Sequence, residues 1–167
     1  HVRSRRQRQM CIRDRYIMEL DVLIMPHIAK MEFSIHPDYW KDEMKRIKAF
    51  FISNDIYTVG PIMFNKEIVG MGEVNYITYI PLNDEIDDIP ELNIKYQPTL
   101  EVYPTISHKC FDEDDFETVY EDIQTFASEN DITLSDKPFF HVMTEYFGGE
   151  VYEIHAEINI DEVELDE

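Results

Sequence analysis

Hydrophobic residues recur at helical spacing in two stretches of the chain and alternate with polar residues in several others. The first helical stretch covers residues 37–54, where Pro37 suits the first helical position and Asn54 suits the end. One face of this helix would carry Trp40, Met44, Ile47 and Phe51. The second stretch covers residues 113–129, and the acids at 112–115 suit the beginning of a helix. Its apolar face would consist of Phe116, Val119, Tyr120, Ile123, Phe126 and Ala127.

The two helical stretches align with each other at an offset of about 76 residues, and the alignment continues into the segments that follow them. The matched positions are Trp40 with Phe116, Met44 with Tyr120, Ile47 with Ile123, Phe50 with Phe126, Ile62–Phe64 with Pro138–Phe140, Gly72 with Gly148, and Tyr76 with Tyr152. Gly72 and Gly148 fall where two alternating segments meet, as expected for hairpin turns. A match that extends from a helix through a hairpin indicates an internal repeat.

Each repeat is predicted to fold as a strand, a helix and a two-stranded hairpin. The predicted strands lie within 21–35, near 57–66 and near 73–82 in the first repeat, and at 99–111, near 138–146 and near 150–160 in the second. We therefore expect an α+β fold of tandem, pseudo-symmetric β-α-β-β repeats with an antiparallel sheet. A single domain would span residues 16–160, with the first repeat at 20–82, a linker at 83–98 and the second repeat at 99–160. Residues 161–167 would form an acidic tail.

The first fifteen residues do not fit the rest of the chain. Residues 5–15 contain five arginines and one acid, in a chain whose formal net charge is −20. This stretch resembles the translation of a transposase sequencing adapter. We therefore expect residues 1–15 to be a disordered, adapter-derived artefact, and the gene to contribute Tyr16 onward.

The charge of the remaining chain limits the possible partners. Without residues 1–15, nine basic and 34 acidic residues remain, and Cys110 is the one cysteine left. Direct nucleic-acid binding needs clustered cations, so we expect none; a small cationic ligand or a basic protein partner suits the charge better. A single cysteine excludes an internal disulfide and suits a reducing cytoplasm. No apolar run approaches the roughly 18 residues of a membrane-spanning helix, so we expect no membrane partner.

Four short motifs resemble the GyrI-like effector-binding fold, which includes the ligand domains of multidrug-sensing transcription activators. VGP at 59–61 and KPFF at 137–140 each follow a helix and begin a hairpin. YITYIPL at 76–82 closes the first repeat, and YEIHAEI at 152–158 closes the second. The resemblance covers about residues 22–160 and is closest to small stand-alone bacterial proteins encoded near LXG-type toxins. No helix-turn-helix segment precedes the domain, so we expect a GyrI-like, SHS2-type domain that does not itself bind DNA.

The resemblance also implies a binding site. In GyrI-like domains a carboxylate in an aromatic-lined pocket recognises cationic, apolar ligands, and matching the motifs places this acid at Glu153. A partly buried carboxylate attracts a cation, and aromatic faces add cation–π attraction. The candidate aromatic residues are Tyr57, Tyr76, Tyr146, Phe147 and Trp40.

The alternation along the last strand leaves a second interpretation of Glu153 open. One face would carry Tyr152, Ile154, Ala156, Ile158 and Ile160, and the other Glu153, His155, Glu157 and Asn159. The second set has the composition of a solvent face, on which Glu153 would be exposed. Glu157 also stands where the family has a proline. Trp40 lies on the apolar stripe of the first helix, where packing is the alternative to ligand binding.

Two other groups could carry chemistry. His155 lies between two acids, but a metal site would need a second His or Cys at motif spacing, so we predict no metal and no cofactor. His108 and Cys110 share a strand face and could act as base and nucleophile, although no third residue orients them. Because Ser34 takes the place of Cys110 in the first repeat, we expect Cys110 to be a buried structural residue.

These observations favour a non-enzymatic binding module for a small, cationic or aromatic ligand. The alternative is an acidic protein-interaction factor, such as an accessory or inhibitor protein in a bacterial toxin or secretion locus. A small-molecule hydrolase on the same fold comes third, with Glu153, Trp40 and Tyr146 as its candidate residues.

Overall fold

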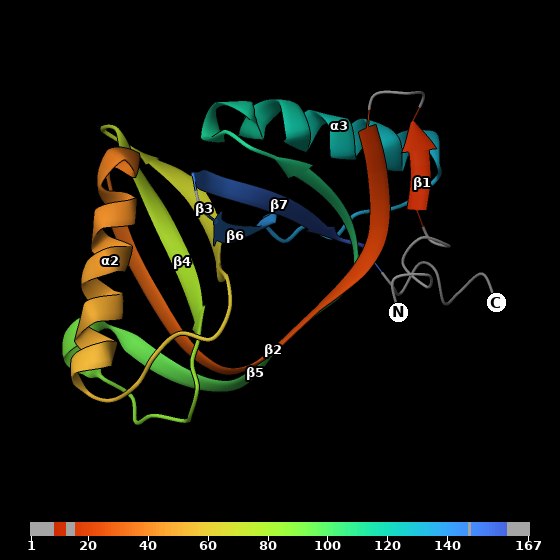
Figure 1. Ribbon diagram of the computed structural model, residues 1–167. Helices are drawn as coiled ribbons and strands as arrows, with labels where there is room; N and C mark the ends of the chain where they lie inside the picture. Colours follow the sequence, from red (N-terminus) through yellow and green to blue (C-terminus); the bar gives the residue numbers. More distant parts are fainter. Residues whose placement is uncertain (1–8, 13–15, 147, 160–167) are drawn as a thin grey trace. The chain divides into compact units, whose positions relative to one another are not determined.

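The computed structural model describes residues 9–12, 16–146 and 148–159, and divides into two units. We call Met25–Leu100 the first-repeat unit, and His1–Ile24 together with Glu101–Glu167 the second-repeat unit. In its described residues each unit contains antiparallel strands and one α-helix (Figure 1). The α+β fold predicted from the hydrophobic pattern is therefore confirmed.

The first-repeat unit follows the predicted order of strand, helix and hairpin. It begins within β2 (Tyr16–Ile35) and continues through α2 (Pro37–Ser53), β3 (Ile62–Gly70) and β4 (Glu73–Pro81). β4 pairs with β2 on one side and with β3 on the other, both antiparallel. α2 lies along one face of these strands (Figure 1).

The core of the first-repeat unit lies between α2 and the hairpin. The helix buries the four residues of the predicted stripe, Trp40, Met44, Ile47 and Phe51. The Trp40 ring centroid lies 4.6 Å from that of Phe64 on β3 and 5.4 Å from that of Tyr76 on β4. Aromatic side chains bury large areas and favour tilted contacts at such distances, so this cluster fixes the helix to the hairpin.

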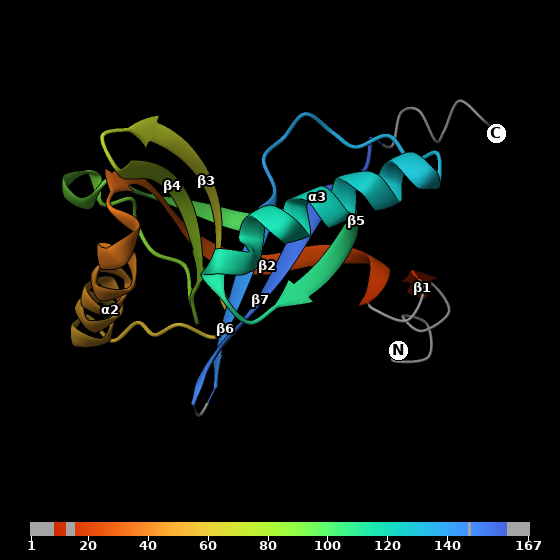
Figure 2. The ribbon, with the colours of Figure 1, turned by 90° about the horizontal axis from the view of Figure 1, so that it is seen from above.

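The second-repeat unit repeats the order. The later part of β5 (Ile94–Cys110) leads through a 3-10 turn, η2 (Glu113–Asp115), into α3 (Phe116–Glu129). The hairpin consists of β6 (Phe140–Tyr146) and β7 (Gly149–Glu157). α3 crosses one face of these strands (Figure 2). The helix predicted at 113–129 is thus a 3-10 turn followed by an α-helix.

In the second-repeat unit β7 is paired on both sides. Its Ile154 lies opposite His108 of β5 and opposite His141 of β6. α3 packs on the face that carries these residues, because the Phe116 ring centroid lies 4.9 Å from those of His141 and Tyr152. The other face of β7 carries the residues that alternate with Ile154.

Ring contacts show the equivalence of the two repeats. In each unit an aromatic residue at the beginning of the helix contacts one ring on each strand of the hairpin. The predicted matches of Trp40 with Phe116 and of Tyr76 with Tyr152 agree with these contacts. The two triplets are Trp40, Phe64 and Tyr76 in the first-repeat unit, and Phe116, His141 and Tyr152 in the second.

One predicted match is wrong by a single residue. The strand pairings place Phe64 at the position of His141 rather than at that of Phe140. The first hairpin has a register shift between Ile68 and Gly70, whereas the register of the second hairpin is continuous. A bulge adds one unpaired residue to a strand. The bulge in β3 therefore shifts the match between β3 and β6 by one residue relative to the match between β4 and β7.

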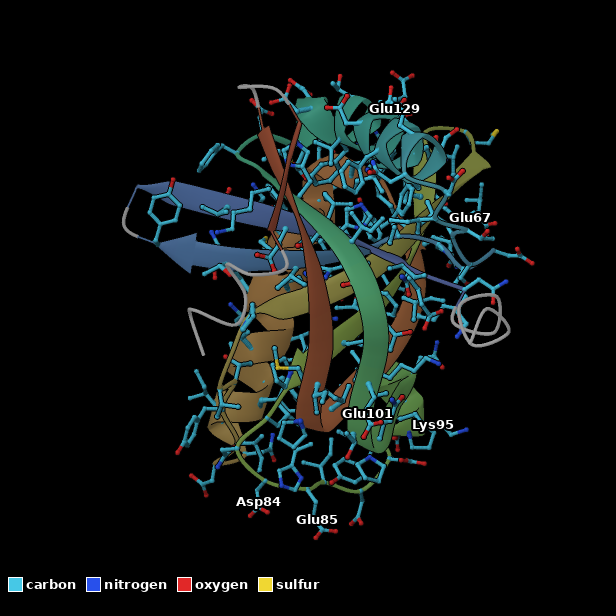
Figure 3. All side chains as sticks on the ribbon, turned by 90° about the vertical axis from the view of Figure 1, so that its right-hand side faces the viewer. Glu67, Asp84, Glu85, Lys95, Glu101 and Glu129 are labelled. Atoms are coloured by element: carbon cyan, nitrogen blue, oxygen red, sulfur yellow. The ribbon has the colours of Figure 1, made fainter. Side chains whose placement is uncertain are left out.

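The acidic segment after β4 contains a 3-10 turn, η1 (Pro90–Leu92), and leads into β5. Figure 3 shows Asp84 and Glu85 extending away from the ribbon in this segment. Tyr96 on β5 stacks against His27 on β2, and its hydroxyl lies 2.8 Å from the Nδ1 atom of His27. The end of the predicted linker is therefore a paired part of the first-repeat unit.

Residues 9–12 lie in the stretch excluded as adapter-derived. They form β1 (Gln9–Ile12), which pairs antiparallel with the beginning of β2, where Gln9 lies opposite Glu19. The sequence pattern predicts disorder here and no strand. β1 pairs only locally among the described residues, as one arm of a hairpin with β2.

Candidate functional site

Glu153, His155 and Thr105 form a hydrogen-bonded chain on the face of β7 that points away from α3. The Oε1 atom of Glu153 lies 2.8 Å from Nε2 of His155, and the Nδ1 atom of His155 lies 2.9 Å from Oγ1 of Thr105. Glu153 and His155 share this face because side chains two apart on a strand point the same way. Thr105 comes from the neighbouring strand β5. Two paired strands therefore hold the three side chains in line.

The chain runs from the interior to the surface. His155 and Thr105 have no exposed area, whereas 22% of the Glu153 side chain is exposed. The prediction of a solvent face is therefore wrong for His155, and Glu153 is half-buried rather than fully exposed. Strand alternation separates the two faces of β7, but it does not reveal that the second face is also covered.

The donors and acceptors of the chain fit one arrangement well. A neutral imidazole donates from one nitrogen and accepts at the other. If the Thr105 hydroxyl donates to Nδ1, the Nε2–H of His155 donates to the ionised carboxylate of Glu153. Both ring nitrogens are then used, so His155 has no lone pair left for a metal ion.

The five aromatic candidates are placed differently from one another. Trp40 and Tyr76 are both buried and in contact, and they form part of the core of the first-repeat unit. Tyr57, which follows α2, and Tyr146, at the end of β6, are each more than half exposed. Phe147 lies outside the described residues.

Tyr146 shares a hairpin face with Glu153. Glu153 lies opposite Val142 on β6, and Tyr146 lies opposite Gly149 on β7. Tyr146 is four residues from Val142, so its side chain is on the same face, roughly 13 Å further along the strand. Of the candidate aromatic residues, Tyr146 is therefore an exposed one that lies on the same hairpin face as Glu153.

Two residues around Glu153 were not predicted. Thr105 completes the hydrogen-bonded chain, and Lys137 pairs with Glu157, the next acid on this face of β7, at 3.1 Å. Neither could be assigned from its own segment, because both contacts depend on which residues of the neighbouring segments lie beside β7. Lys137 therefore pairs with Glu157, and His155 contacts Glu153.

Cys110 lies on the other face of this sheet, toward α3. It is buried, and burial raises the pKa of its thiol to about 11. Burial also lowers the pKa of His108, although the nearby Asp122 acts in the opposite direction. A protonated thiol is a poor nucleophile, which supports a structural role for Cys110. The strand pairings match Cys110 with Phe33 and not with Ser34.

We expect the Cys110 thiol to be unreactive in the native protein. In a Cys11→Ser background, where Cys110 is the only thiol, a disulfide reagent at pH 8 should react roughly 100-fold more slowly than with the denatured chain, because the raised pKa leaves little thiolate. The reaction is followed by absorbance with and without denaturant. Equally fast reaction in both states would return Cys110 to the candidate nucleophiles.

Other features of the described residues add no further ligand set. A shallow depression on the outer face of α3 is lined by Glu121, Gln124, Thr125, Ser128 and Glu129, which all come from one helix. In this part of the chain no three His, Cys, Asp or Glu side chains are grouped so that they could hold a metal ion. Neither of its α-helices has the length and apolar character of a membrane span.

Solved structures share the fold at low sequence identity. The C-terminal domain of EcmrR matches with a TM-score of 0.62 and 9% identity over 85% of this chain and 98% of that domain. EcmrR in a complex with DNA matches at 0.61 and 8% identity, over 84% of this chain and 57% of that one. A hydrolase from Listeria innocua matches at 0.57 and 7% identity, over 84% and 91% of the two chains. At the level of the fold, this agrees with the GyrI-like resemblance.

No curated protein matches the sequence. A family described as a domain of unknown function, DUF5085, matches residues 23–162, which is most of the chain. The chain belongs to the DUF5085 family.

Proposed function

We propose that this protein is a non-enzymatic binding module for a small ligand that is cationic and aromatic, and that Glu153 is the acid that recognises it. The proposal rests on the contact and the partial exposure of the Glu153 side chain. Its carboxylate is held by a buried histidine, yet part of it is exposed to solvent. It is therefore held in position and is partly accessible from solvent.

The surroundings of Glu153 strengthen its attraction for a cation. A half-buried carboxylate lies in a lower effective dielectric than one in bulk water, so an approaching positive charge is attracted more strongly. An N–H donated from a neutral imidazole would stabilise the anion without cancelling its charge. Tyr146, on the same hairpin face, offers an exposed aromatic ring for a ligand that also has apolar surface.

The same geometry speaks against hydrolysis. The hydrogen-bonded order of acid, histidine and hydroxyl is also that of a hydrolase triad, in which the hydroxyl attacks the substrate. Here the hydroxyl belongs to Thr105, which has no exposed area, so a substrate cannot reach it. The likeness to a hydrolase structure is a likeness of fold, and carries no residue of a reaction to this chain.

The test compares the wild type with Glu153→Gln, which keeps the shape of the side chain and can still accept the bond from His155. The probe is thioflavin T, an aromatic dye with a permanent positive charge, titrated at low ionic strength and followed by fluorescence. We expect the substitution to weaken binding by about tenfold or more, as for the loss of a charged hydrogen-bonding partner. Stability should change little, because the hydrogen bond is retained.

The matched control is Glu121→Gln, which removes the same charge from the exposed side of α3. It should bind the dye like the wild type, because the net charge alone does not make the site. The uncharged analogue of thioflavin T, which lacks the ring N-methyl group, should bind wild type and Glu153→Gln equally. Equal affinities of both proteins for the charged dye, or no binding to either, would contradict the proposal and favour the acidic protein-interaction alternative.

A further inference from the structure

We infer that His155 is the positioning residue of the ligand site: held by Thr105, it fixes the carboxylate of Glu153 for the ligand. The inference rests on the proposed function, since it assigns a role toward the same acid. His155 would not touch the ligand, because none of its surface is exposed. It acts through the 2.8 Å contact of its Nε2 atom with Glu153.

The first argument is the comparison of the two repeats. The strand pairings match Glu153 and His155 with Ile77 and Tyr79, and Thr105 with Ile28. These positions of the first-repeat unit hold two aliphatic residues and a tyrosine. The fold therefore does not need an acid, a histidine and a hydroxyl at these places.

The second argument is the cost of the arrangement. A buried imidazole and a buried hydroxyl must both find partners, since unsatisfied polar groups in the interior are destabilising. Thr105 and Glu153 satisfy the two ring nitrogens of His155. Such a network need not add stability over the two aliphatic residues and the tyrosine that the first repeat uses, so its value lies in fixing an orientation.

The third argument is what the chain does to Glu153. A glutamate has three side-chain torsions, and a partly exposed one samples several rotamers. The bond from His155 holds Oε1 against the sheet, which leaves the exposed edge of the carboxylate in one direction. A ligand then binds without the entropy cost of ordering this side chain, which is how preorganised sites gain affinity.

The wild-type protein offers a direct test by nitrogen NMR of the histidine rings at pH 7.5. The signal of His155 is identified by its loss in His155→Gln. We expect the tautomer with the proton on Nε2, because only that form donates to Glu153 while Nδ1 accepts from Thr105. A proton on Nδ1 alone would overturn the inference, since Nε2 would then have nothing to donate.

A matched pair of substitutions tests the role in binding. His155→Gln places an amide N–H near the position of Nε2 and can still reach Glu153, whereas His155→Asn places its amide near Nδ1 and can reach only Thr105. Thioflavin T should bind His155→Gln within about threefold of the wild type, and His155→Asn about tenfold more weakly. If His155 had only a structural role, dye binding would not be weaker in His155→Asn than in His155→Gln.

The outcomes separate the inference from the proposed function. If Glu153→Gln weakens binding but a folded His155→Asn does not, Glu153 binds the ligand without His155 and the inference fails alone. If Glu153→Gln binds like the wild type, the proposed function fails and the inference with it. Should His155→Asn not fold, Thr105→Val leaves the imidazole in place. The carboxylate still favours the Nε2–H tautomer, but the ring loses the partner that holds it, so binding should weaken about threefold. Unchanged binding in Thr105→Val would overturn the inference.

Discussion

Trp40→Ala is expected to lower the free energy of unfolding by about 3–5 kcal/mol, the usual cost of removing a buried aromatic side chain. Trp40 is 2% exposed and contacts the rings of Phe64 and Tyr76. Its removal leaves a cavity between α2 and the hairpin that rigid strands cannot close. The loss is measured by denaturant unfolding followed by far-UV circular dichroism, because the variant has no tryptophan left to report by fluorescence.

Trp40→Phe is the matched control. Phenylalanine is the residue at the equivalent position, 116, where it makes the corresponding ring contacts. The indole Nε1 of Trp40 is buried and has no hydrogen-bond partner among the described residues, so its loss offsets part of the lost packing. We expect a loss below about 1.5 kcal/mol. If Trp40→Ala kept its stability but lost dye binding, Trp40 would belong to the ligand site and not to the core.

The helices and the repeat could be predicted because periodicity depends on local geometry. The stripe from Trp40 to Phe51 is buried as expected, and α2 ends at Ser53, one residue before the predicted Asn54. The match of Trp40 with Phe116 follows from the same spacing. Alternation also predicts correctly that Glu153 and His155 share a face.

The remaining features depend on contacts between distant segments. The bulge after Ile68 changes the register by one residue, and the alignment of the two repeats at a constant offset matches Phe64 with Phe140 instead of His141. The burial of His155 requires that both faces of β7 be covered, and alternation reports only that the faces differ. The role of Thr105 depends on the register of β5 against β7. Pairing between strands, and not the pattern within one strand, creates this part of the site.

Ile154→Glu is expected to lower the free energy of unfolding by about 4 kcal/mol or more, a large part of the stability of an ordinary domain. Ile154 has no exposed area and faces α3 from the strand that is paired on both sides. A carboxylate there would lose its hydration. The two residues opposite it are poor partners for the charge, because burial lowers the pKa of His108 and the Nε2 atom of His141 already contacts the Tyr120 hydroxyl. The loss is measured at pH 7 by denaturant unfolding, followed by circular dichroism, which reports on the secondary structure of the whole chain.

The pH dependence of this loss identifies its cause. Burial would raise the pKa of the introduced carboxyl group above the unfolded value of about 4.3, so the protonated form is favoured in the folded state. The unfolded chain releases that proton first as pH rises, so the deficit is largest above the folded pKa and shrinks as pH falls toward 4. Ile154→Gln should show a loss that does not change with pH in this range. If the loss of unfolding free energy in Ile154→Glu did not change with pH, the shape of the new side chain, and not its charge, would be the cause.

Glu153→Ile at the neighbouring position should have the opposite outcome. It recreates the residue of the first repeat, Ile77, on the face of β7 that carries the hydrogen-bonded chain. The apolar side chain leaves the buried Nε2–H of His155 without its acceptor, which costs about 1–3 kcal/mol. Removal of a half-buried charge offsets part of this cost, so we expect a folded protein that loses at most about 2 kcal/mol. Thioflavin T binding should be lost, since no carboxylate remains to attract the cation. If Glu153→Ile is stable but binds no dye, while Ile154→Glu is unstable, β7 uses one face for the core and the other for the ligand. If Glu153→Ile unfolded the protein, Glu153 would be needed for the fold. The presence of Ile77 at the equivalent position of the first repeat would then need another explanation.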